Sequence, residues 1–93
     1  MNRSVSELMP RDGRKSFYGK AHIIHTDRAA YLRSYDTIVA SVTEDGVLHR
    51  HWGGWSATTG RHIASFSDEF TNREIRKKEW DDLPVEDAPI GIY

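Results

Sequence analysis

The chain contains no cysteine, so it can form no disulfide and can hold no metal through thiolates. A small domain without disulfides is typical of a reducing compartment, and we therefore expect a cytoplasmic protein. The N-terminus lacks the apolar stretch of a signal peptide, and no run of about 18 apolar residues occurs that would span a membrane. These absences predict a soluble protein with no membrane partner.

An excess of charge of either sign is also lacking. The 13 lysines and arginines nearly balance the 14 acidic residues, which leaves a formal net charge of -1. Proteins that coat DNA or RNA are usually strongly basic, because phosphate contacts supply most of their affinity. We therefore do not favour nucleic acid as the main partner, although a local basic patch leaves that alternative open.

The length of 93 residues suits one domain. Residues 1–14 are polar, contain Pro10 and Gly13 and show no sustained periodicity, so we expect a flexible N-terminal arm. A single α+β domain then occupies residues 15–93. Residues 88–93 are apolar for a tail, which predicts either an added edge strand or a contact with a neighbouring subunit.

The first half of the domain has the signals of an antiparallel meander. Alternation of apolar and polar residues, or β-branched enrichment, predicts strands within 17–23, 31–42 and 47–52. The polar residues 26–28 predict a turn. Glu44-Asp45-Gly46 predicts a hairpin, since Asp-Gly accepts the positive φ of a tight turn.

The periodicity becomes helical after Gly53-Gly54. Ile63, Phe66 and Phe70 follow the i, i+3, i+7 spacing of an amphipathic helix. Ser56, Thr58 and Thr59 precede this stripe and are suitable N-cap residues.

A second helix is expected directly after the first. Thr71 and Glu74 have the spacing of a capping box, which predicts a helix from Asn72 toward Asp82 that Pro84 ends. The predicted fold class is therefore α+β: an antiparallel three- or four-stranded sheet followed by two C-terminal helices packed on one face.

The glycine-rich turn before the first helix is the most informative stretch for function. A helix N-terminus presents unpaired N–H groups and a positive dipole end, which can bind an anion, and tryptophan offers a flat face for a base. The candidate ligand-binding residues are Trp52, Gly53, Gly54, Trp55, Ser56, Thr58, Thr59, Arg61 and His62. The expected ligand is a phosphate-bearing small molecule. The alternative is structural: the glycines make a turn, the hydroxyls cap the helix and the tryptophans fill the core.

Catalysis and metal binding have weaker support. His49, His51 and His62 are zinc-ligand types, but no cysteine or clear acidic ligand completes a site, so we predict no metal and no cofactor. Ser56, His62 and Asp36 contain the residue types of a triad without the Gly-x-Ser-x-Gly elbow. We predict a non-catalytic binding protein, with a small nuclease or hydrolase centred on His62 as the less favoured alternative.

A basic run lies in the predicted second helix and comprises Arg73, Arg76, Lys77 and Lys78. Acidic residues are interleaved with it, and mixed signs favour a solvated helix face. A regulator that binds nucleic acid through this run is the alternative.

Four segments carry a family resemblance: 15–21 (KSFYGKA), 32–39 (LRSYDTIV), 52–63 (WGGWSATTGRHI) and 77–86 (KKEWDDLPVE). They resemble a family of small uncharacterised proteins of phages, prophages and mobile elements, over roughly residues 15–86. The resemblance implies an accessory protein in the cytoplasm of a bacterial host cell that acts in counter-defence, by sequestering a nucleotide-type signal or by blocking a host defence protein. It implies no catalytic residue.

A homodimer is also expected. A small core, exposed sheet edges and an apolar C-terminus all favour pairing, and symmetric dimers are the commonest oligomers.

Overall fold

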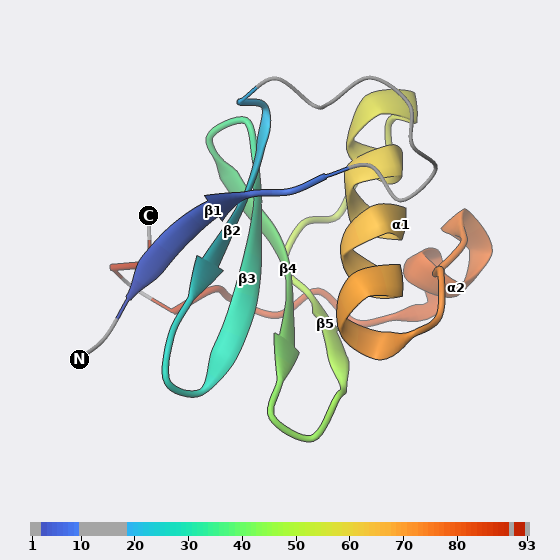
Figure 1. The fold of residues 1–93 in the computed structure, drawn as a ribbon. Helices are drawn as coiled ribbons and strands as arrows, with labels where there is room; N and C mark the ends of the chain where they lie inside the picture. Colours follow the sequence, from blue (N-terminus) through green and yellow to red (C-terminus); the bar gives the residue numbers. More distant parts are fainter. Residues whose placement is uncertain (1–2, 10–18, 90, 93) are drawn as a thin grey trace.

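Five antiparallel strands form one sheet, and two helices follow them in the chain (Figure 1). The computed structural model describes residues 3–9, 19–89 and 91–92. The elements are β1 (Ser4–Glu7), β2 (Ala21–His25), β3 (Ala29–Ser34), β4 (Thr37–Thr43), β5 (Leu48–Arg50), α1 (Ala57–Thr71) and α2 (Lys77–Asp82). The strands lie in the sheet in chain order, which makes an antiparallel meander. The predicted α+β class is confirmed.

The predicted number of three or four strands is wrong, because the sheet has five. The additional strand, β1, lies inside residues 1–14, where we expected a flexible arm. All four of its residues are exposed, so it has no alternating buried positions for a sequence pattern to detect. The expected strand over 31–42 is divided between β3 and β4 at Tyr35, which adopts a left-handed φ of 55°. A tyrosine is an uncommon residue for that conformation.

The predicted hairpins agree better with the structure. Gly46 has a φ of 78° in the turn that joins β4 to β5. The Thr26 N–H donates to the Ala29 carbonyl at 3.0 Å in the turn that joins β2 to β3. The beginning of the expected strand over 17–23, up to Tyr18, lies outside the described residues.

The main core lies between one face of the sheet and the two helices (Figure 1). The fully buried Ile63 and Phe66 of α1, which the helical spacing predicts, pack against sheet residues such as Ile23 and Leu32. Trp80 of α2 is 0% exposed and belongs to the same cluster. Both helices therefore cover one face, as predicted. Within the described ranges, neither helix is long and apolar enough to cross a membrane.

The boundary between the helices differs from the prediction. Helix α1 continues to Thr71 and ends at Asn72, which takes a left-handed φ of 59°, and α2 begins only at Lys77. Thr71 is thus no N-cap: its hydroxyl donates to the Ser67 carbonyl at 2.7 Å. The expected capping box is wrong because asparagine tolerates the left-handed conformation that ends a helix.

The C-terminal segment crosses the second face of the sheet, which is the face opposite α1 (Figure 1). Val85 forms a parallel bridge with Arg50 at the β5 edge. Farther along, Ala88 and Ile92 pack against a second cluster that contains Ile24 and Ile38. The tail therefore touches the edge of the sheet at one bridge and then packs on its own chain; Ile90 and Tyr93 lie outside the described residues.

Candidate ligand-binding groove

Arg50 organises the loop that leads from β5 to α1. Its side chain is 6% exposed, and its guanidinium donates to four backbone carbonyls. These are the carbonyls of Trp52 (2.9 Å), Gly53 (2.8 Å), Trp80 (2.9 Å) and Leu83 (3.1 Å). The guanidinium carbon also lies 5.2 Å from the centre of the Trp80 ring. One buried cation thus ties β5, the tryptophan loop and α2 together, with its donors satisfied as burial of a charge requires.

The glycines of the loop and helix make room for tryptophan rings. A Cβ on Gly54 would lie 2.6 Å from the Trp52 ring, and a Cβ on Gly60 would lie 2.6 Å from the Trp55 ring. The Gly54 carbonyl accepts a hydrogen bond from Trp80 Nε1 at 2.9 Å. Close ring–backbone packing therefore explains both glycines.

Two hydroxyls and His62 form a buried polar cluster behind the start of α1. Ser34 Oγ shares hydrogen bonds with Thr59 Oγ1 at 3.1 Å and with His62 Nδ1 at 2.8 Å. Burial, and then the positive charges of Arg61 and Lys20, lower the pKa of His62 to about 4. The imidazole is therefore neutral at pH 7 and belongs to the interior of the protein.

The predicted site residues consequently divide into two groups. Ser56 is the N-cap of α1, since its Oγ accepts the Thr59 N–H at 3.0 Å. Most of the other predicted residues also have structural roles. Trp52 packs against the core, and Thr59 and His62 are buried. The carbonyls of Gly53 and Gly54 accept hydrogen bonds from Arg50 and Trp80. Thr58 is exposed at the helix N-terminus. Only Trp55 and Arg61 of the predicted set line a groove on the side of α1.

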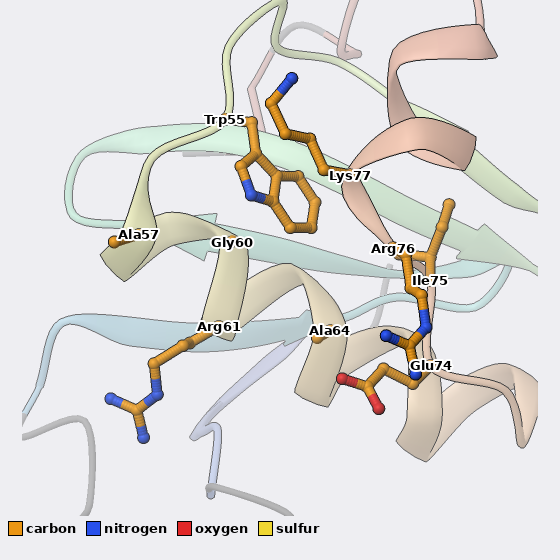
Figure 2. A pocket seen from close by; sticks show the side chains of 9 residues that line it. All are labelled: Trp55, Ala57, Gly60, Arg61, Ala64, Glu74, Ile75, Arg76 and Lys77. Carbon is orange, nitrogen blue, oxygen red and sulfur yellow. The ribbon is translucent and has the colours of Figure 1, made fainter.

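This groove has a volume of about 290 Å³ and lies between α1 and the segment that leads into α2 (Figure 2). One wall is a stripe of small residues on α1, comprising Ala57, Gly60 and Ala64, and the Trp55 ring stands beside it. The opposite wall comes from residues 74–77. The sequence motifs that we treated as separate alternatives, the tryptophan–glycine turn and the basic run, therefore meet in one place.

Three cations and one carboxylate surround the groove. Arg61 comes from α1, and Glu74, Arg76 and Lys77 come from the opposite wall. Lys77 Nζ also lies 2.7 Å from Asp81 Oδ2. This ion pair weakens the attraction between Lys77 and an external anion. Arg61 and Arg76 bring guanidinium groups to the groove from its two opposite walls.

The basic run as a whole is less suited to nucleic acid. Arg73 Nη2 lies 2.6 Å from Glu79 Oε2, which raises the pKa of the guanidinium and lowers the pKa of the carboxyl group. With Arg73 and Lys77 in ion pairs, two of the four basic side chains already face carboxylates. This pattern agrees with a solvated helix face.

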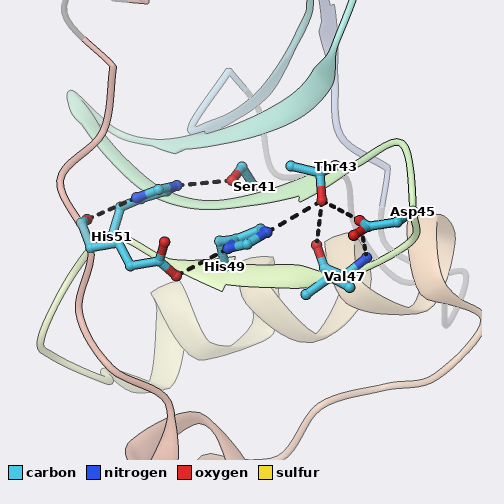
Figure 3. Close-up of polar contacts among 7 residues, drawn as sticks. Ser41, Thr43, Asp45, Val47, His49 and His51 are labelled. Carbon is cyan, nitrogen blue, oxygen red and sulfur yellow. Dashed lines mark hydrogen bonds and ion pairs between the residues drawn. The ribbon is translucent and has the colours of Figure 1, made fainter.

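His49 and His51 lie on the second face of the sheet (Figure 3). His49 shares hydrogen bonds with Thr43 Oγ1 at 3.2 Å and Glu86 Oε2 at 3.0 Å, and His51 shares one with Ser41 Oγ at 2.8 Å. The Thr43 hydroxyl also donates to Asp45, and this bond lowers the pKa of the Asp45 carboxyl group. No group of three or more His, Cys, Asp or Glu in the part of the chain that the structure describes is arranged to hold a metal ion.

The three residues of the hypothetical triad have different surroundings. Ser56 caps α1, His62 is buried against Ser34, and Asp36 is exposed in the turn between β3 and β4. The nucleophile and the base each have a hydrogen-bond partner outside the triad, so this arrangement gives no support to acyl transfer.

Fold and groove define a small α+β protein with an open groove between its two helices. Within that class, the chain belongs to a family of unknown function (DUF8033), whose model matches residues 6–82. Membership of an uncharacterised family agrees with the resemblance, whereas the association with phages stays a prediction. The match begins within β1 and ends with α2, so it leaves out the tail on the second face. No curated protein and no solved structure matches the chain.

Proposed function

We propose that this protein acts by binding, and that the groove between α1 and residues 74–77 captures a phosphate-bearing nucleotide. The observation that carries the proposal is that the Trp55 ring lines the same groove as Arg61, Arg76 and Glu74. Aromatic rings stack on bases of any sequence, and guanidinium groups bind phosphate through paired N–H donors.

Glu74 favours a nucleotide over a simple anion. A carboxylate repels free phosphate, but it accepts hydrogen bonds from base amino groups and ribose hydroxyls. A ligand that is anionic at one end and donates hydrogen bonds at the other therefore suits this set of side chains. The groove volume of about 290 Å³ lies at the small end of ligand pockets, which favours a mononucleotide whose outer part stays in solvent.

The biological role that we propose is counter-defence by an accessory protein of a phage or mobile element, through sequestration of a nucleotide-type signal. The family resemblance motivates this setting, and the groove lined by Trp55, Arg61 and Arg76 supports it. Blocking a host defence protein is the alternative role.

Isothermal titration with nucleoside monophosphates, nucleosides and inorganic phosphate tests the proposal. Nucleoside monophosphates should bind, while nucleosides and phosphate, each of which fills half of the site, should bind more weakly. Arg61→Ala and Arg76→Ala should each weaken binding about tenfold or more, because a hydrogen bond to a charged group contributes about 1.5–3 kcal/mol.

Two matched controls sharpen the result. Thr58→Ala removes an exposed hydroxyl from the N-terminus of α1 outside the groove, and Lys78→Ala removes one charge from α2 outside the groove; both should bind like the wild type. Loss of binding in Thr58→Ala but not in Arg76→Ala would place the ligand at the helix end. Absence of any nucleotide binding would refute the proposal, and a steeply salt-dependent affinity for oligonucleotides would favour the nucleic-acid alternative.

A further inference from the structure

In the part of the chain that the structure describes, strand β1 is an open edge of the sheet. It pairs with β2 on one side, and all four of its residues are exposed. The opposite edge is partly covered, because Val85 bridges Arg50 beside β5 and the Glu86 N–H donates to the Arg50 carbonyl at 2.7 Å. An open edge presents backbone N–H and C=O groups that can pair with another strand.

The register of β1 shows which of its backbone groups point outward. The Leu8 N–H donates to the Ala21 carbonyl at 3.0 Å, and the same register pairs Glu7 with His22 and Val5 with Ile24. Successive residues of an antiparallel strand direct their backbone groups to opposite sides. Because Leu8 faces β2, the backbone groups of Glu7, Val5 and Arg3 face the open edge.

Arg3, Val5 and Glu7, whose backbone groups face the open edge, form a self-complementary set. If β1 pairs antiparallel with β1 of another copy about a two-fold axis at Val5, each Val5 lies opposite Val5 and each Arg3 lies opposite Glu7. Every pair then consists of residues whose backbone groups face outward, so each can exchange both hydrogen bonds. Opposite charges directly across a strand pair are also favourable.

We propose that a second copy of this chain docks on β1 in this register and joins the two sheets into one continuous sheet. Val5, whose side chain is 53% exposed, then covers its equivalent at the two-fold axis. The register is isologous, as a closed dimer requires, and charge complementarity selects it over neighbouring registers.

The contacts that Arg3 and Glu7 make within the chain are compatible with this pairing. Arg3 Nη1 donates to the Gly91 carbonyl at 2.6 Å, and Glu7 Oε1 accepts the Gly19 N–H at 2.6 Å. A guanidinium has five donors and a carboxylate accepts about four hydrogen bonds, so each group has capacity for a partner across the interface. The interface is short compared with the roughly 1,200–2,000 Å² of stable complexes, and the dimer should dissociate on dilution.

Sedimentation velocity over a range of concentrations tests this inference on the full chain. The wild type should show a monomer–dimer equilibrium. Arg3→Glu and Glu7→Arg should each weaken dimerisation at least tenfold by placing like charges opposite one another, and the double variant Arg3→Glu/Glu7→Arg should restore it. Lys78→Glu, a charge reversal away from β1, should leave the equilibrium unchanged.

Val5→Pro provides a test that does not depend on side-chain charge. Proline removes an N–H that faces the open edge and leaves the β1–β2 hydrogen bonds intact, a position at which edge strands accept proline. This variant should keep the wild-type circular dichroism spectrum and sediment as a monomer. A wild type that is monomeric at all concentrations, a Val5→Pro variant that still dimerises, or a double variant no better than the single ones would overturn the inference.

Discussion

Replacement of Arg50 by methionine should destabilise the protein strongly, because the guanidinium holds β5, the tryptophan loop and α2 together. The hydrogen bond to the Trp80 carbonyl is buried, and those to Trp52, Gly53 and Leu83 are partly buried. A buried bond to a charged group contributes about 1.5–3 kcal/mol, and a carbonyl that solvent can reach recovers most of its loss. Methionine also keeps the packing of the aliphatic stem. We therefore expect a net loss of about 3 kcal/mol.

Urea denaturation followed by tryptophan fluorescence measures this loss. A domain of this size has a total free energy of unfolding of roughly 5–14 kcal/mol, so a loss of about 3 kcal/mol is a large part of it. In a thermal melt, the same loss should lower the midpoint by roughly 12 °C or more. Arg28→Met is the matched control, since Arg28 is exposed in the turn between β2 and β3. If Arg50→Met were no less stable than Arg28→Met, the guanidinium would not organise the loop.

Three further predictions concern packing, pH and the tail. Replacing glycine by alanine stabilises an ordinary helix by about 1 kcal/mol. Gly60→Ala should instead destabilise the protein by about 1–2 kcal/mol in a urea titration, because the new Cβ would lie 2.6 Å from the Trp55 ring. A gain in stability would contradict this packing. The free energy of unfolding should fall by up to about 3 kcal/mol as the pH drops from about 6.5 toward about 4, because in that range the imidazole of His62 binds a proton in the unfolded chain but stays neutral in the folded protein, where its pKa is about 4. The fall should be shallower in His62→Gln, and equal slopes in the two proteins would refute the assignment. Ile92→Ala should lower the free energy of unfolding by about 2 kcal/mol, because Ile92 is 9% exposed against Ile24 and Ile38; an unchanged urea midpoint would show that the tail does not pack on the sheet.

The strongly patterned elements of the fold could be predicted from the sequence. The Asp45-Gly46 turn and the stripe of Ile63 and Phe66 are local signals, and the structure has the hairpin and the helix that they predict. Strand β1 could not be predicted, because an edge strand with every residue exposed has no hydrophobic alternation. The false capping box at Thr71 shows a second limit: the same residues suit a helix start and the left-handed end of a longer helix.

The candidate site was predictable only in part. Of the residues predicted around the tryptophan–glycine turn, Trp55 and Arg61 line the groove, whereas most of the others pack or cap. The contribution of Arg76 depends on the tertiary position of α2, which no local pattern specifies. The spacing of Ala57, Gly60 and Ala64 is a signal that could have revealed the wall of the groove, since small residues at i, i+3 and i+7 leave one side of a helix open. The role of Arg50 could not be predicted, because its four carbonyl partners come from two segments that are distant in the sequence, residues 52–53 and residues 80–83.

The central claim is that the groove between α1 and residues 74–77 captures a nucleotide. Native mass spectrometry of the protein purified from phage-challenged and unchallenged cells tests this claim most directly. The wild type should carry a small bound mass that is released on denaturation and has the ultraviolet absorbance of a nucleobase. The double variant Arg61→Ala/Arg76→Ala should be free of it, while Thr58→Ala should retain it. A wild type without bound mass from either source, which also binds no nucleotide in titration, would contradict the account and direct attention to a protein target.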